Sequence, residues 1–233
     1  MEISKEKESI GDKINDFVKK NRKAIIMVFG VFVLLFAGLI VWFLISDSMS
    51  KKATAEIVEL TEEYEKLRFG EEADYYSADM NALLARLDEF AGKNTGFPGS
   101  KAWSNIAHIY SGRQDWARSE EAWLNSARVG AKTYLGPIAL FQAAVAAEEQ
   151  NKLEKAVEYL QQCVSHSFEF PDAPRAQFNI GRLYEQLGNY SAALEAYRAV
   201  LINWPWERSE AISQNMHVWQ NLARNQIIKL ELR

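Results

Sequence analysis

Cysteine is almost absent from this chain of 233 residues, in which Cys163 is the only one. A single thiol excludes an intramolecular disulfide and any metal site built from a cluster of cysteines. Cys163 falls on the core-facing side of a predicted helix. We therefore expect it to be a buried packing residue rather than a reactive one.

The sequence also lacks the motifs of common enzymes. G-x-S-x-G, G-x-x-x-x-G-K and G-x-G-x-x-G are all missing, and His108, His166 and His217 lie far apart without the spacing of a zinc site. The adjacent pairs Glu120-Glu121 and Glu148-Glu149 cannot converge, because helical neighbours do not face each other. We interpret both pairs as solvated charges. The expectation is a protein without enzyme activity, cofactor or metal.

Basic residues are not concentrated on one surface stripe. The net charge is −4, and the sequence has no basic stripe. A protein that binds nucleic acid needs such a stripe, so this class of partner is not expected.

Residues 24–45 contain no charged residue. A helix of this length spans roughly 33 Å, which is enough to cross the hydrocarbon core of a bilayer. The run exceeds the roughly 7–15 apolar residues of a cleaved signal peptide, so it predicts a permanent anchor. Basic residues precede it at Lys19, Lys20, Arg22 and Lys23, and Asp47 follows it. The positive-inside rule then places the tail 1–23 in the cytoplasm and the rest of the chain outside.

Residues 174–205 predict two short amphipathic helices joined by the turn Leu187-Gly188-Asn189-Tyr190. They resemble the 34-residue tetratricopeptide repeat (TPR), matching six of about eight diagnostic positions. The matching residues are Ile180, Gly181, Tyr184, Ala193, Tyr197 and Pro205. Small residues let the two helices approach, tyrosines fill the gaps beside them, and the proline ends the second helix. Gln177 and Val200 depart from the pattern.

One such unit cannot bury its own apolar face, so neighbouring units are expected. Residues 100–133 and 137–170 supply them, and the three units start 37 residues apart. The second unit is weaker, because Ala147 replaces the aromatic residue and Phe168 replaces the proline.

Helical patterns on either side complete the predicted fold. Ser48 to Phe69 and Tyr75 to Lys93 predict a degenerate first repeat, and Glu207 to Leu230 predicts a capping helix. The expected fold is all-α: one transmembrane helix followed by a TPR solenoid of antiparallel helix pairs. Its parts are a cytoplasmic tail (1–23), the transmembrane helix (24–45), a linker with the degenerate repeat (46–99), and the repeats with their cap (100–233).

The TPR resemblance implies a groove lined by the first helix of each repeat. The groove positions are Lys101, Ser104, His108, Ile138, Phe141, Val145, Arg175, Phe178 and Arg182. Phe141 and Phe178, with Arg175 and Arg182 nearby, would suit an apolar segment that carries some negative charge. In the alternative interpretation, both phenylalanines pack into neighbouring helices.

The order of the parts, together with the motif Phe17 to Ala24 (FVKKNRKA), resembles the YfgM family of ancillary subunits of the bacterial Sec translocon. The resemblance implies an inner-membrane protein with a periplasmic repeat domain. Its expected partners are translocon subunits, periplasmic chaperones or exported chains. The competing hypotheses are a scaffold for envelope assembly or cell division, which could form homo-oligomers, and a subunit whose chemistry lies in a partner.

Overall fold

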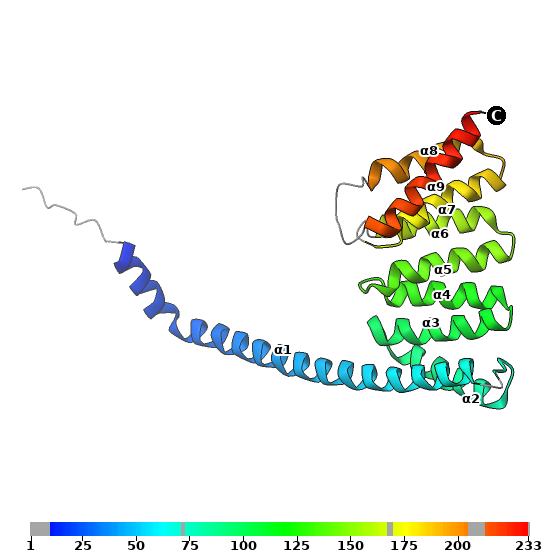
Figure 1. Cartoon of the computed structure of the whole chain (residues 1–233). Coiled ribbons are helices and arrows are strands. Elements are labelled where there is room, and N and C mark those ends of the chain that lie inside the picture. The colour runs from blue at the N-terminus through cyan, green and yellow to red at the C-terminus, as the bar shows by residue number, and fades with distance from the viewer. Residues whose placement is uncertain (1–9, 71–72, 167–169, 205–212, 233) are drawn as a thin grey trace, which may run out of the picture. The chain divides into compact units, whose positions relative to one another are not determined.

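The computed structural model describes residues 10–70, 73–166, 170–204 and 213–232. All the regular elements in these ranges are helices (Figure 1). In chain order they are α1 (Ile10–Phe69), α2 (Ala78–Lys93), α3 (Gly96–Gly112), α4 (Trp116–Val129), α5 (Leu135–Glu149), α6 (Leu153–His166), α7 (Ala173–Gln186), α8 (Tyr190–Asn203) and α9 (Ser213–Glu231). The all-α array of helices that the sequence predicts is therefore confirmed.

The chain divides into two compact units, residues 1–52 and 53–233. The first holds the N-terminal part of α1. Within the described residues, no helix carries an apolar stretch sufficient to cross a membrane. This finding differs from the anchor predicted at residues 24–45. Many side chains of that stretch, among them Trp42 and Phe43, lie outside the described residues.

The second unit is a stack of helices that run back and forth (Figure 1). The helices α3, α5 and α7 are the first helices of the three predicted repeats, and α4, α6 and α8 are their second helices. Residues 53–69 of α1 contribute Ile57, Leu60 and Tyr64 to the same core as Leu83 and Leu87 of α2.

The turn inside each repeat uses the same backbone conformation. Gln114, Asn151 and Gly188 lie 37 residues apart, and they have positive φ angles of 57°, 57° and 75°. Only glycine, and less often asparagine, adopts this conformation at little cost. In the first and third repeats an N-cap follows: the side chains of Asp115 and Asn189 accept hydrogen bonds from the third residue beyond each.

The third repeat packs as its sequence pattern predicts. A Cβ atom added to Gly181 would lie 2.6 Å from the ring of Tyr197, so only glycine leaves room for that ring. Ala193 is fully buried beside it. Gln177, which departs from the repeat pattern, is half-buried and donates a hydrogen bond to the carbonyl oxygen of Ala196 at 3.2 Å. Pro205, the expected helix terminator, lies outside the described residues; α8 ends at Asn203.

Cys163 is fully buried on α6, as predicted, and its thiol donates to the carbonyl oxygen of Pro137 at 3.2 Å. Burial, with a smaller contribution from Asp172, raises the pKa of this thiol to about 12. A thiol with such a pKa is almost entirely protonated at neutral pH, so it is a poor nucleophile.

Candidate functional site: the wall of first helices

The predicted groove residues occupy corresponding positions of α3, α5 and α7, and they form three rows. We call this surface the inner wall. The middle row is Ser104, Phe141 and Phe178, and the two outer rows are Lys101, Ile138 and Arg175, and His108, Val145 and Arg182.

The middle row is buried. Phe141 and Phe178 are only 7% and 8% exposed. The ring of Phe178 lies 5.1 Å from that of Tyr197 and 5.4 Å from that of Trp219, measured between centroids. The guanidinium of Arg175 covers Phe141 at 4.8 Å. Both phenylalanines therefore pack into neighbouring helices, as the alternative interpretation held: Phe141 lies against α7, and Phe178 lies against α8 and α9.

The outer rows carry the accessible side chains. Val145 is 38% exposed and Arg175 is exposed, while Lys101, Ile138, His108 and Arg182 are half-buried. Arg182 is already engaged, because its two terminal nitrogens each donate to a carboxylate oxygen of Glu148 at 2.6 Å. These hydrogen bonds hold the pKa of Glu148 below its usual range. The prediction that Glu148 is a solvated charge was therefore wrong: it joins α5 to α7.

At the end of the inner wall nearest α1, His108 packs against aromatic rings. The ring of His108 packs edge-on against Trp123 at 4.8 Å and stacks near Tyr64 at 6.4 Å. Burial, with smaller contributions from the nearby Arg68 and Lys101, lowers the pKa of His108 to about 4. Burial also lowers the pKa of Lys101. His108 is therefore neutral at physiological pH.

A buried carboxylate joins the first repeat to the second, and sequence reasoning missed it. Glu120 of α4 is 6% exposed. It accepts hydrogen bonds from the side chains of Gln150, Lys152 and Tyr159 at 2.7, 2.9 and 2.8 Å. Burial opposes ionisation, but these three donors outweigh it and hold the pKa of Glu120 below its usual range. Glu120 is thus not a solvated charge, whereas Glu121 is exposed as predicted.

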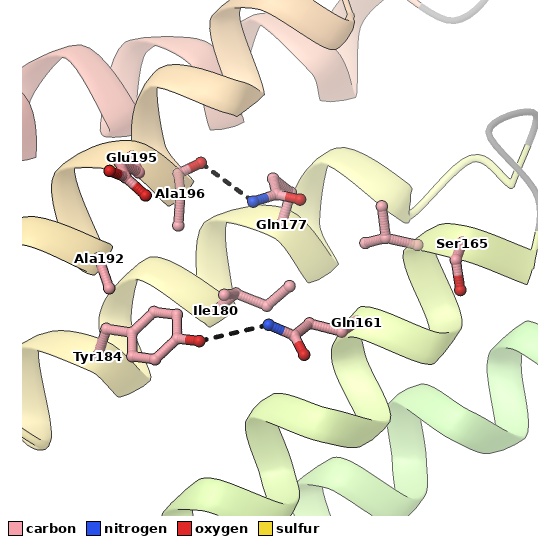
Figure 2. A pocket seen from close by; sticks show the side chains of 9 residues that line it. Gln161, Ser165, Gln177, Ile180, Tyr184, Ala192, Glu195 and Ala196 are labelled. Carbon is pink, nitrogen blue, oxygen red and sulfur yellow. Dashed lines mark hydrogen bonds between the residues drawn. The ribbon is translucent and has the colours of Figure 1, made fainter.

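The opposite side of the stack, which we call the outer face, carries a pocket of about 460 Å³ between α6 and α8, with α7 as its floor (Figure 2). Figure 2 shows two hydrogen bonds inside it, from Gln161 to the hydroxyl of Tyr184 and from Gln177 to the carbonyl oxygen of Ala196. Because both amide groups already have partners within the chain, the pocket offers few uncommitted polar groups. Glu195 lies exposed on its lining.

A corresponding pocket of about 370 Å³ lies between α2 and α4, over α3. Its residues Trp103, Ile106 and Tyr110 stand 74 positions, or two units, before Gln177, Ile180 and Tyr184 of the first pocket. The second repeat has the reverse arrangement: Ala147 replaces the tyrosine of the first helix, and Tyr159 stands where the other repeats have Ala122 and Ala196. The aromatic residue that the second repeat lacks in its first helix is therefore supplied by its second helix. That swap was readable in the sequence.

No group of three or more histidine, cysteine, aspartate or glutamate side chains within the described ranges could hold a metal ion. The three histidines lie on different helices, α3, α6 and α9.

Comparisons of the sequence with known proteins find tetratricopeptide repeats. Two family models described as tetratricopeptide repeat match this chain, one over residues 138–166 and the other over 164–205. A TPR repeat-containing protein of Treponema pallidum (strain Nichols) is 28% identical over 211 residues, covering 83% of this chain and 87% of that protein. A solved structure, the crystal structure of MamA, aligns with a TM-score of 0.43 and 13% identity, over 65% of this chain and 86% of that chain. The repeat matches over residues 138–205 and the paired helices show that this chain contains tetratricopeptide repeats.

Proposed function

We propose that this chain is a membrane-tethered protein-interaction module at the bacterial Sec translocon, where its inner wall assists exported chains or periplasmic chaperones. TPR arrays are protein-binding scaffolds, and the chain has no motif of an enzyme. The observation that carries the proposal is the inner wall itself, where Val145 and Arg175 are accessible on neighbouring first helices.

The exposed side chains of the wall define the chemistry of the partner. Val145 and the half-buried Ile138 offer apolar contact, and Arg175 offers a positive charge. Arg182 contributes little further charge, because Glu148 neutralises it. A partner segment with apolar residues and a nearby carboxylate fits this surface.

The proposed tether is residues 24–45, with the N-terminus in the cytoplasm and the repeats in the periplasm. The charge-free run and the basic residues before it support this placement. Large apolar side chains of α1 that lack protein cover also support it: Met27, Phe29, Phe32 and Phe36 are 65–71% exposed. Tethering beside a translocon would raise the effective concentration of the wall for chains that emerge there.

Site-specific photocrosslinking in native membranes tests the proposal. The probe is placed at Val145 on the inner wall, and a control probe is placed at Glu195 on the outer face; Phe178 is unsuitable because it is buried. We expect crosslinks to translocon subunits, exported chains or periplasmic chaperones from Val145 and not from Glu195. Crosslinks only to division or wall-assembly proteins would replace the proposal with the scaffold hypothesis, and an absence of crosslinks at Val145 would reject the inner wall as the binding surface.

A charge reversal tests the role of the wall. Arg175→Glu should reduce the Val145 crosslinks several-fold, and Glu195→Lys should leave them unchanged. Equal yields from both variants would exclude Arg175 as a determinant of partner binding.

A further inference from the structure

The last helix of the described chain, α9, is apolar on two opposite faces. One face is buried: Ala223 and Leu230 join Phe178, Tyr197 and Val200 in a separate core cluster, with Trp219 and Ile227 packed beside them. This face attaches α9 to α7 and α8 at the end of the stack (Figure 1).

The other face is exposed to solvent. Val218, Leu222, Ile228 and Leu232 are 52%, 38%, 56% and 83% exposed. At about 100° per residue, these four positions lie within a sector roughly 120° wide, opposite the buried face. Leu232 lies just past the end of α9, but its amide donates to the carbonyl oxygen of Ile228 at 3.1 Å and so continues the helical turn. A helix with apolar side chains on both faces is normally covered on both.

The spacing of the exposed residues indicates what covers them. They are separated by four, six and four positions, which is a symmetric pattern centred on Asn225. If a second copy of α9 packs antiparallel about Asn225, Val218 lies opposite Leu232 of the other copy, and Leu222 lies opposite Ile228. Each apolar side chain then meets an apolar side chain.

Polar residues of the same stripe also suit this arrangement. Asn225 of one copy lies opposite Asn225 of the other, and the two side-chain amide groups can pair by hydrogen bonds. Lys229 faces Asn221, and the two lysines stand eight residues, or about 12 Å, apart along the axis. A parallel arrangement would instead place Lys229 directly against Lys229.

We propose that the exposed face of α9 is a self-association surface on which two copies of this chain pack antiparallel about Asn225. A two-fold axis makes such an interface self-complementary. The contact is about 22 Å long and sits at the small end of stable interfaces, so the dimer should dissociate readily on dilution. Two copies anchored in one membrane would associate more strongly, because their movement is confined.

Disulfide trapping in the full-length chain tests the register. Native Cys163 is fully buried, so an introduced cysteine is the only accessible thiol in the described part of the chain. Asn225→Cys should form a covalent dimer on mild oxidation, and a mixture of Val218→Cys with a size-tagged Leu232→Cys should form the mixed dimer in preference to either homodimer. Arg224→Cys is the matched control: it is exposed but lies off the stripe, and it should crosslink at least five-fold less.

Equal crosslinking of Arg224→Cys and Asn225→Cys, or none from either, would overturn the proposal. So would crosslinks from Asn225→Cys in cells that lead only to a different protein.

Charge placed on the stripe provides a second test. Leu222→Lys with Ile228→Lys should shift concentrated purified protein in detergent from dimer to monomer by analytical ultracentrifugation, while its circular dichroism stays that of the parent. Tyr134→Lys, at an exposed aromatic residue far from α9 in the sequence, should leave the dimer intact. A folded double variant that remains dimeric would exclude this face as the interface.

Discussion

Replacing Glu120 by glutamine, with Glu121→Gln beside it as a control, gives a direct test of the polar contact between the first and second repeats. The two glutamates are adjacent in the sequence, yet Glu120 is 6% exposed and Glu121 lies in solvent. Glutamine has nearly the shape of glutamate. The substitution therefore removes charge and one acceptor without leaving a cavity.

The expected loss follows from the three donors. A hydrogen bond to a charged group contributes about 1.5–3 kcal/mol, and glutamine can still accept one from Tyr159. The bond to Lys152 counts for less, because that side chain is 40% exposed and water screens the pair. We expect Glu120→Gln to lower the free energy of unfolding by about 2 kcal/mol, and Glu121→Gln to change it by less than about 0.5 kcal/mol.

Urea unfolding in detergent, followed by tryptophan fluorescence, measures both variants. The pH dependence adds a second readout. The pKa of Glu120 in the folded chain lies below its ordinary value of 4.5, so its contribution is complete above pH 4.5 and is lost as the pH falls through the folded-state pKa. The difference between the parent and Glu120→Gln should therefore shrink below pH 4.5. Equal losses from the two variants, or a difference that does not depend on pH, would refute the assignment of Glu120 as a buried ionised acceptor.

Three further predictions concern single residues of the repeats. Gly181→Ala should lower the free energy of unfolding by about 1–3 kcal/mol in thermal or urea unfolding, because the added methyl group meets the ring of Tyr197; Gly92→Ala, where no atom lies within 4 Å, should not destabilise the chain. His108 should titrate near pH 4 by NMR, and because the unfolded chain binds that proton first, stability should fall as the pH drops from 6.5 towards 4; a His108→Gln variant should lose this dependence. The thiol of Cys163 should resist a maleimide reagent at neutral pH and react once urea unfolds the chain; rapid labelling of the native protein would contradict its burial.

The repeat pattern could be predicted from the sequence because it depends on local spacing. Gly181 and Tyr197 lie 16 residues apart, within one pair of helices, and the repeat pattern predicts their contact. The turns at Gln114, Asn151 and Gly188 follow the same 37-residue period.

Contacts between repeats were harder to predict. Glu120 reaches side chains 30 to 39 positions away, and nothing in its immediate sequence distinguishes it from Glu121. Phe141 and Phe178 were assigned to the groove by position. Whether a side chain at that position is covered depends on the neighbouring helix, as Arg175 and Trp219 show. The reversed arrangement of Ala147 and Tyr159 was visible in the sequence, but only when two repeats are aligned.

The hydrogen bonds and the ion pair between neighbouring repeats depend on the order of the repeats along the chain. Glu120 accepts a hydrogen bond from Tyr159 across the junction between the first and second repeats. At the next junction, 37 residues further along, the corresponding positions hold Val157 and Ala196, which cannot form this bond. The pair of Glu148 and Arg182 belongs only to the second junction. The polar contacts at each of these two junctions fit only the repeats that form it, so the repeats cannot be exchanged without losing them. A chain with its repeats permuted would keep every helix and lose the bonds that hold them in sequence.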